Sequence, residues 1–247
     1  QWAEKHKALE ATNVKGGDEG NYANLNANGT GPFMLGSRQS GVKTELEINP
    51  NYWGKVKGNI TKAVFTPIAQ DATRVAALIS GNVHMAYPVP VQDWKRLDDA
   101  KGVKPLAGPE ARTIFLGFDQ LRDELLYSNI KGKNPFKDLR VRQAFIKAIN
   151  IDAVKKKVMR GASVPAGLMV APQINGFNAA LNDRPAYDPK GAKKLLADAG
   201  YPDGFEVTMD CPNNRYVNDE RICQASASML AKIGIKVTLL AQPKSKY

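Results

Sequence analysis

The chain has 247 residues, of which 43% are hydrophobic and 24% charged, so its length and composition suit a folded protein of one large or two small domains and argue against wholesale disorder. No apolar run reaches the roughly 18 residues that a membrane-spanning helix requires. The net charge is +11, but the basic residues are scattered and do not cluster with aromatic residues, which favours a lysine-rich surface over a nucleic-acid-binding face.

The first 28 residues predict a short helix and a loop. Residues 2–11 have helical character, and residues 16–28 are rich in Gly and Asn, which do not sustain regular structure. No secretory signal peptide opens the chain, so we expect that the start of a precursor has been removed or that more is missing.

Residues 42–97 predict a mixed α/β layer of the order β-β-α-β-α. The period-two alternation of residues 42–48 is typical of a half-buried strand, and residues 63–68 and 83–87 predict two more. Asp71 is the expected N-cap of a helix that ends at Ile79, and residues 91–97 predict a second, short helix.

The second half predicts the order β-α-α-loop-α-β-α-β. The strands are expected at residues 113–118, 206–209 and 235–240, and the helices at 136–149, 151–159, from Asp188-Pro189 to Gly200, and from Asn218 or Asp219 to Ile233. Asp138 is the expected cap of the first of these helices. The character of the sequence changes near residues 108–112, where we place a domain boundary.

Motifs of catalysis and metal binding are missing from the sequence. It contains no GxSxG, HExxH, GxGxxG or P-loop motif, and its two histidines provide few general bases, so we expect no enzyme. Cys211 and Cys223 form no CxxC pair, and His6 and His84 lie far away in the sequence, so we expect no metal site and no cofactor.

The loop from Cys211 to Asp219 is the candidate binding element. It follows a predicted strand and precedes a helix, and ligands bind at such strand-end loops in α/β layers. Arg215 offers a planar donor fork for a carboxylate, and Tyr216 offers apolar area with a polar tip. Asn213 and Asn214 add donors and acceptors. A plain surface loop remains the alternative interpretation of these residues.

Six motifs in order resemble the peptide-binding proteins of ABC importers, bacterial extracellular solute-binding family 5. They are Gly29-Thr30-Gly31-Pro32-Phe33, Asn49-x-x-Tyr52-Trp53, residues 75–83, Asn134-Pro135-Phe136-x-Asp138-x-Arg140-Val141-Arg142-Gln143-Ala144, residues 187–205, and Ile233-Gly234-Ile235. The resemblance implies a two-lobed α/β fold of the type II periplasmic binding protein class, which this chain represents incompletely at both ends. It assigns residues 1–28 to the tail of an inserted subdomain, 29–111 to lobe I and 112–247 to lobe II.

The resemblance also implies a function and site residues. We expect a monomeric periplasmic receptor that binds a peptide and delivers it to the membrane permease subunits of an ABC importer. Arg215 is similar in place to an arginine that pairs with the ligand carboxylate, and Tyr216 to a tyrosine that lines the pocket. Asp119 and Tyr87 are weaker candidates for cleft residues. An oxidising periplasm permits a disulfide between Cys211 and Cys223, which we predict.

The sequence leaves two alternative functions open. The same fold binds nickel, haem, opine or sugar-like ligands in other receptors, and the net charge of +11 leaves a nucleic-acid-binding module as a third reading.

Overall fold

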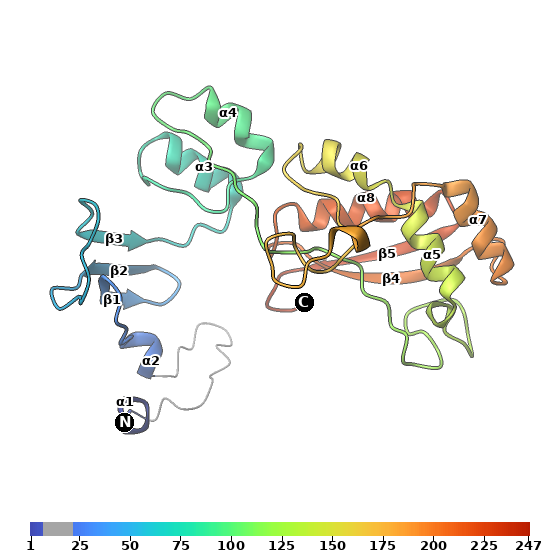
Figure 1. Cartoon of the computed structure of the whole chain (residues 1–247), viewed down its shortest axis with the longest axis horizontal. Helices are drawn as coiled ribbons and strands as arrows, with labels where there is room; N and C mark the ends of the chain where they lie inside the picture. The colour runs from blue at the N-terminus through green and yellow to red at the C-terminus, as the bar shows by residue number, and fades with distance from the viewer. Residues whose placement is uncertain (7–21) are drawn as a thin grey trace. The chain divides into compact units, whose positions relative to one another are not determined.

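The computed structural model describes residues 1–6 and 22–247 (Figure 1). They form two compact units, Gln1–Ala77 and Leu78–Tyr247. The predicted Gly-rich stretch at residues 16–21 lies outside the described residues. In the described part of the chain, no helix is long and apolar enough to cross a membrane. The lobe boundary at residues 111 and 112 concerns the complete receptor and stays a prediction.

The first unit is built on a three-stranded antiparallel sheet with the order β1-β2-β3. Its strands are β1 (Phe33–Gln39), β2 (Lys43–Ile48) and β3 (Lys62–Phe65), and its helices α1 (Trp2–Lys5) and α2 (Tyr22–Leu25) are single turns. The sequence reasoning missed β1, which reaches β2 through a tight turn in which Gly41 adopts a positive φ of 69°. On β2, hydrogen bonds from Lys43 and Lys62 lower the pKa of Glu45 to about 2.

Two helical predictions in the middle of the chain are confirmed, and two strand predictions are wrong. Helix α3 (Asp71–Ile79) has the predicted bounds, and the predicted helix at 91–97 is η1 (Val91–Asp93) followed by α4 (Trp94–Asp98). Residues 83–87 and 113–118 are apolar but form no strand. A strand requires a hydrogen-bonded partner, and apolar composition alone does not supply one.

Helices η2 (Pro135–Lys137), α5 (Leu139–Ala148) and α7 (Pro189–Asp198) are capped by side chains that the sequence marks. Asp138 accepts a hydrogen bond from the amide of Arg140, and Asp188 accepts one from the amide of Gly191. Asn134 accepts from the Phe136 amide and donates to the carbonyl oxygens of two residues in the preceding loop. The predicted 151–159 helix is the short α6 (Ile151–Ala153) and a π-helical turn η3 (Val154–Val158), and η4 (Ala179–Leu181) lies in the loop after it.

A parallel pair of strands joined by a helix completes the second unit. Strands β4 (Phe205–Pro212) and β5 (Ile235–Gln242) pair in parallel from Phe205 opposite Ile235 to Pro212 opposite Gln242. Helix α8 (Asp219–Ala231) connects them and packs on both strands (Figure 1). The parallel arrangement places the loop after β4 and the chain after β5 at the same edge of the sheet.

The core of the second unit is an aromatic and aliphatic cluster between α5, α7, α8 and the sheet. Phe136, Phe145 and Phe205 have ring centroids 5.2–6.3 Å apart in edge and tilted arrangements. Val141, Leu196 and Ile235 are fully buried against them. This core holds the β4–α8–β5 unit rigid and thereby fixes the loop that follows β4.

We predict that Phe145→Ala lowers the free energy of unfolding by about 3–5 kcal/mol, because it removes a ring at the centre of this cluster. Urea unfolding followed by circular dichroism measures the change. The neighbouring Ile146 is 40% exposed, so Ile146→Ala is the matched control and should cost much less. Equal losses from the two variants would contradict this assignment of the core.

Candidate functional site

The candidate site is the loop of residues 213–218, between the last residue of β4 and the first residue of α8. It lies at the carboxyl end of a parallel strand, which is where open α/β sheets bind their ligands. The amide of Asn213 donates to the carbonyl of Gln242, and the Asn214 side chain accepts from the amide of Lys244 at 2.7 Å. The loop is therefore tied to the chain that follows β5.

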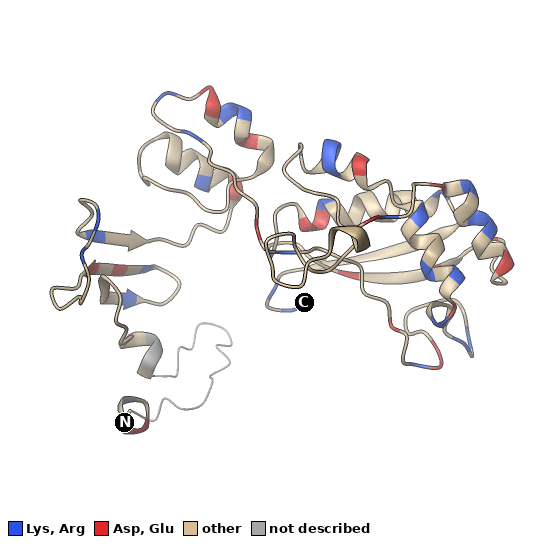
Figure 2. Ribbon diagram, viewed as in Figure 1, with Lys and Arg blue, Asp and Glu red and all other residues tan. Residues whose placement is uncertain are grey.

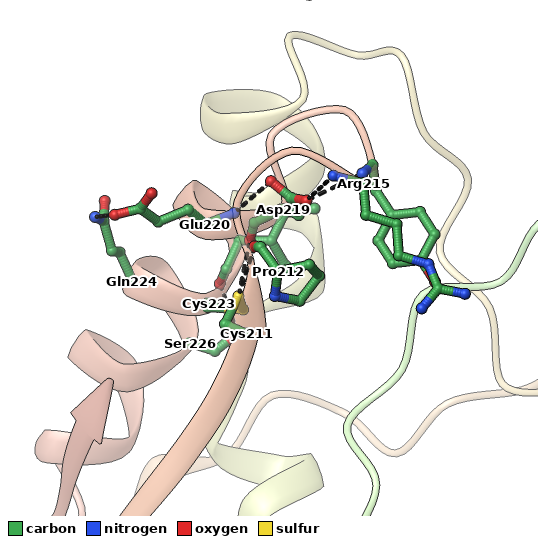
Figure 3. The surroundings of a disulfide bond; sticks show 10 residues. Cys211, Pro212, Arg215, Asp219, Glu220, Cys223, Gln224 and Ser226 are labelled. Atoms are coloured by element: carbon green, nitrogen blue, oxygen red, sulfur yellow. Dashed lines mark hydrogen bonds between the residues drawn. A yellow bond between two sulfur atoms is a disulfide. The ribbon is translucent and has the colours of Figure 1, made fainter. Parts of the chain in front are cut away.

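The carboxylate of Asp219 organises the loop from inside (Figure 3). Asp219 is only 6% exposed. Its Oδ2 accepts from the amides of Arg215 at 2.8 Å and Tyr216 at 3.0 Å, and its Oδ1 accepts from the amide of Glu220 at 2.9 Å. A buried carboxylate is tolerated when such hydrogen bonds replace its lost hydration. The sequence predicted Asn218 or Asp219 as a helix cap; Asn218 occupies the N-cap position, and its side chain forms no capping hydrogen bond.

Asn218 has a different role at the end of the loop. It adopts a left-handed conformation with φ of 57°, which asparagine tolerates better than most residues. Its side-chain amide donates to the carbonyl of Val158 at 2.9 Å. The loop is thus also fastened to η3.

A disulfide joins the end of β4 to the first turns of α8, as predicted. Cys211 and Cys223 are bonded, with Cα atoms 6.6 Å apart and a sequence separation of 12. Cys211 is completely buried. The cross-link closes a covalent ring that contains the whole candidate loop, so the positions of both loop ends are fixed.

Arg215 and Tyr216 stand on this braced loop. The guanidinium Cζ of Arg215 lies 5.0 Å from the Tyr216 ring centroid, within the range of a cation–π contact. Figure 3 shows the Arg215 side chain directed away from the Asp219 carboxylate. Arg215 is exposed, and no carboxylate of a described residue forms an ion pair with it. Its donor fork is therefore free to take an external anion.

The sequence reasoning missed Arg112 as a neighbour of this loop. Its Cζ lies 5.2 Å from the same Tyr216 ring centroid. Arg112 belongs to the extended segment before the predicted 113–118 strand, so nothing in local sequence periodicity could have paired it with Tyr216.

The two weaker candidates are Asp119 and Tyr87. Asp119 accepts from the amides of Leu121 and Arg122 and forms an ion pair with the Arg122 side chain, so its carboxylate closes a local turn. Tyr87 is 75% exposed and is the last residue of the segment 83–87, which forms no strand. Within the described ranges, no hydrogen bond, ion pair or ring contact joins either residue to Arg215 or Tyr216.

A polar hollow of about 250 Å³ lies elsewhere in the second unit. Its lining comes from residues 149–152 and 182–187 and includes Arg184. The Arg184 side chain donates to the carbonyl of Ala166, and burial lowers the pKa of its guanidinium. None of the residues predicted for the site lines this hollow, and it is not at a strand end.

Lys and Arg residues are spread over helices, strands and loops of the chain and are interspersed with Asp and Glu (Figure 2). In the described residues no group of three or more His, Cys, Asp or Glu side chains is placed to hold a metal ion.

Known proteins share this architecture. The glutathione-binding protein GsiB of Shigella flexneri is 29% identical over 213 residues, which are 86% of this chain and 39% of that protein. The periplasmic binding protein DppA of Helicobacter pylori, solved in complex with the peptide STSA, is 28% identical with a TM-score of 0.68, and the match covers 89% of this chain and 40% of that one. The binding protein AgaA of A. tumefaciens R10, solved in complex with agropinic acid, is 27% identical with a TM-score of 0.64, covering 87% and 42%.

The mixed α/β fold and these likenesses define the class: the chain has the fold of periplasmic solute-binding proteins over part of their length. Residues 3–247 match the middle region of bacterial extracellular solute-binding proteins, family 5, and the chain belongs to this family. Its members are solute-binding proteins of ABC importers and not enzymes. The chain spans about 40% of the length of the relatives it matches.

We predict that reducing the disulfide lowers the free energy of unfolding by about 3 kcal/mol, because the closed loop restricts the unfolded chain. Thermal or urea unfolding with and without a reductant measures the loss. The double variant Cys211→Ala/Cys223→Ala is the control, and the reductant should not change its free energy of unfolding. A wild-type protein whose stability is also indifferent to the reductant would contradict the prediction.

We predict that Arg122→Gln raises the pKa of Asp119. The Arg122 side chain, its amide and the Leu121 amide hold this pKa below its ordinary value by hydrogen bonding. The ionised carboxylate therefore stabilises the fold above about pH 4, and that stabilisation is lost as the pH falls through the lowered pKa.

Carboxyl ¹³C NMR titration measures this pKa. Asp138, whose own pKa is lowered by Arg140, serves as the internal reference and should not move in the variant. An unchanged titration of Asp119 would show that the ion pair with Arg122 does not form in solution.

Proposed function

We propose that this chain is part of the substrate-binding component of an ABC importer, that it binds peptides in the periplasm, and that Arg215 receives a ligand carboxylate. The observation that carries the proposal is the exposed guanidinium of Arg215, which forms no ion pair with a described residue and lies over Tyr216 on a loop that Asp219 and the disulfide brace. An arginine fork recognises a carboxylate through two parallel hydrogen bonds.

The rigidity of the loop supports this function. A side chain that is ordered before the ligand arrives loses less conformational freedom on binding, so more of its interaction energy appears as affinity. Tyr216 supplies a flat apolar wall beside the guanidinium, and Asn213 presents an exposed amide at the same edge. Together these groups suit the end of a peptide, which carries a carboxylate, an amide and a side chain.

The partners follow from the family. A receptor of this kind releases its ligand to membrane permease subunits, and we propose the same for the protein to which this chain belongs. We propose that it acts as a monomer.

A non-peptide acid is the second candidate ligand. The relative AgaA was solved with agropinic acid, and a free guanidinium does not by itself distinguish a peptide from another carboxylate. Native mass spectrometry of the purified full-length protein, followed by release and identification of any retained ligand, separates the two candidates. Recovery of peptides supports the first, and recovery of a non-peptide acid alone contradicts it.

We predict that Arg215→Gln weakens peptide binding by the full-length protein by at least tenfold, the equivalent of about 1.4 kcal/mol, because a charge-assisted pair is replaced by a neutral contact. Isothermal titration calorimetry measures the affinity. Arg215→Lys should retain part of it, since a lysine keeps the charge and loses the planar fork.

The exposed Arg221 on α8 provides the matched control, because Arg221→Gln removes the same charge one helical turn beyond the loop. Its affinity should stay close to that of the wild type. If both variants weaken binding equally, the cause is a general effect of net charge and not a direct contact of Arg215 with the ligand. If Arg215→Gln binds with unchanged affinity, Arg215 is not part of the site.

A further inference from the structure

Two guanidinium groups share one aromatic ring at the candidate site. The Cζ atoms of Arg215 and Arg112 lie 5.0 and 5.2 Å from the Tyr216 ring centroid, and we call these three residues the Tyr216 cluster. Because both distances are measured to one point, the two Cζ atoms are at most about 10 Å apart, with each in the range of a cation–π contact. Two cations so close repel each other unless anions neutralise them.

Carboxylates of the described residues neutralise this pair only in part. Asp219 lies beneath the loop, but backbone amides of Arg215, Tyr216 and Glu220 occupy its carboxylate. In the described part of the chain, the one ion pair of the cluster joins Arg112 to Glu110 at 2.9 Å. Both of its side chains are about half exposed, and exposed ion pairs contribute little and exchange readily.

We propose that Arg112 determines specificity by selecting peptides that carry a second acidic group at their carboxyl-terminal residue. This inference rests on the proposed function, in which Arg215 takes the terminal carboxylate. The two carboxylates of a C-terminal glutamate are separated by only a few bonds. The terminal carboxylate therefore pairs with Arg215 while the side-chain carboxylate pairs with Arg112. The ligand's second carboxylate replaces Glu110 as the partner of Arg112.

The geometry distinguishes this role from a purely structural one. A structural arginine would have its donors bonded to backbone carbonyls, as Arg142 does with the carbonyls of Phe136 and Lys137. Arg112 has a side chain that is 44% exposed, and its carboxylate partner is only two residues away in the sequence. Its contact with the ring of Tyr216 places the charge at the binding loop.

The test measures calorimetric affinities of the full-length protein for matched peptides of two to five residues, an alanine series ending in Glu and the same series ending in Gln. The wild type should prefer the Glu-terminated member of the length it binds by about tenfold at low salt, the effect of one added charge-assisted pair. Raising the salt concentration should shrink the preference, because the pair is partly exposed.

Three variants test whether Arg112 causes the preference for Glu-terminated peptides. Arg112→Gln should abolish it and leave the affinity for the Gln-terminated peptide within about twofold of the wild type, and Arg112→Lys should restore part of it as a point charge. Glu110→Gln should increase the preference, because it removes the internal competitor. Arg96→Gln is the matched control and should change nothing, since Arg96 is an exposed arginine of α4 with an ion pair to Asp93, the residue before that helix.

The outcomes separate the two proposals. Equal affinity of the wild type for the two series, or a preference that persists in Arg112→Gln, overturns the role of Arg112 and leaves the peptide receptor standing. If a folded Arg112→Gln protein binds neither peptide series, the specificity role of Arg112 is also overturned, because the residue would then be needed for every ligand. If the wild type binds neither series at any length, both proposals are overturned.

Discussion

The three hydrogen bonds that the buried Asp219 carboxylate accepts are the interaction on which the candidate site depends. A buried charge without partners would be costly, so the loop amides must converge on it. That convergence fixes the backbone of Arg215 and Tyr216 and leaves both side chains to point elsewhere. Backbone amides hydrogen-bond the carboxylate of Asp219, so the positively charged side chain of Arg215 points away from it.

The β4–α8–β5 unit gives this interaction a rigid base. The parallel register runs through all eight residues of both strands, and α8 packs on the sheet beside the phenylalanine cluster. Ser128 and Asn129 cover the other edge of β4, where the Ser128 hydroxyl donates to the carbonyl of Glu206. The strand that leads to the site is therefore held along both edges near its first residues.

Much of this arrangement is predictable from the sequence, because it depends on local chemistry. Caps at Asp138 and Asp188, the helix from Asp71 to Ile79 and the strand-end place of Arg215 all follow from residues close to each other in the chain. The strands expected at residues 83–87 and 113–118 did not form, because pairing depends on a partner that no local pattern reveals. Arg112 was missed for the same reason, since its contact with Tyr216 joins distant segments.

The bond between Cys211 and Cys223 also makes the order of the loop depend on where the chain folds. In an oxidising compartment the sulfur atoms join and the loop ends are fixed, whereas in a reducing cytosol glutathione keeps both thiols free. A chain made in the cytosol would then have the same sheet and helices with a looser loop after β4. The loop thus reaches its tightest form only in an oxidising compartment.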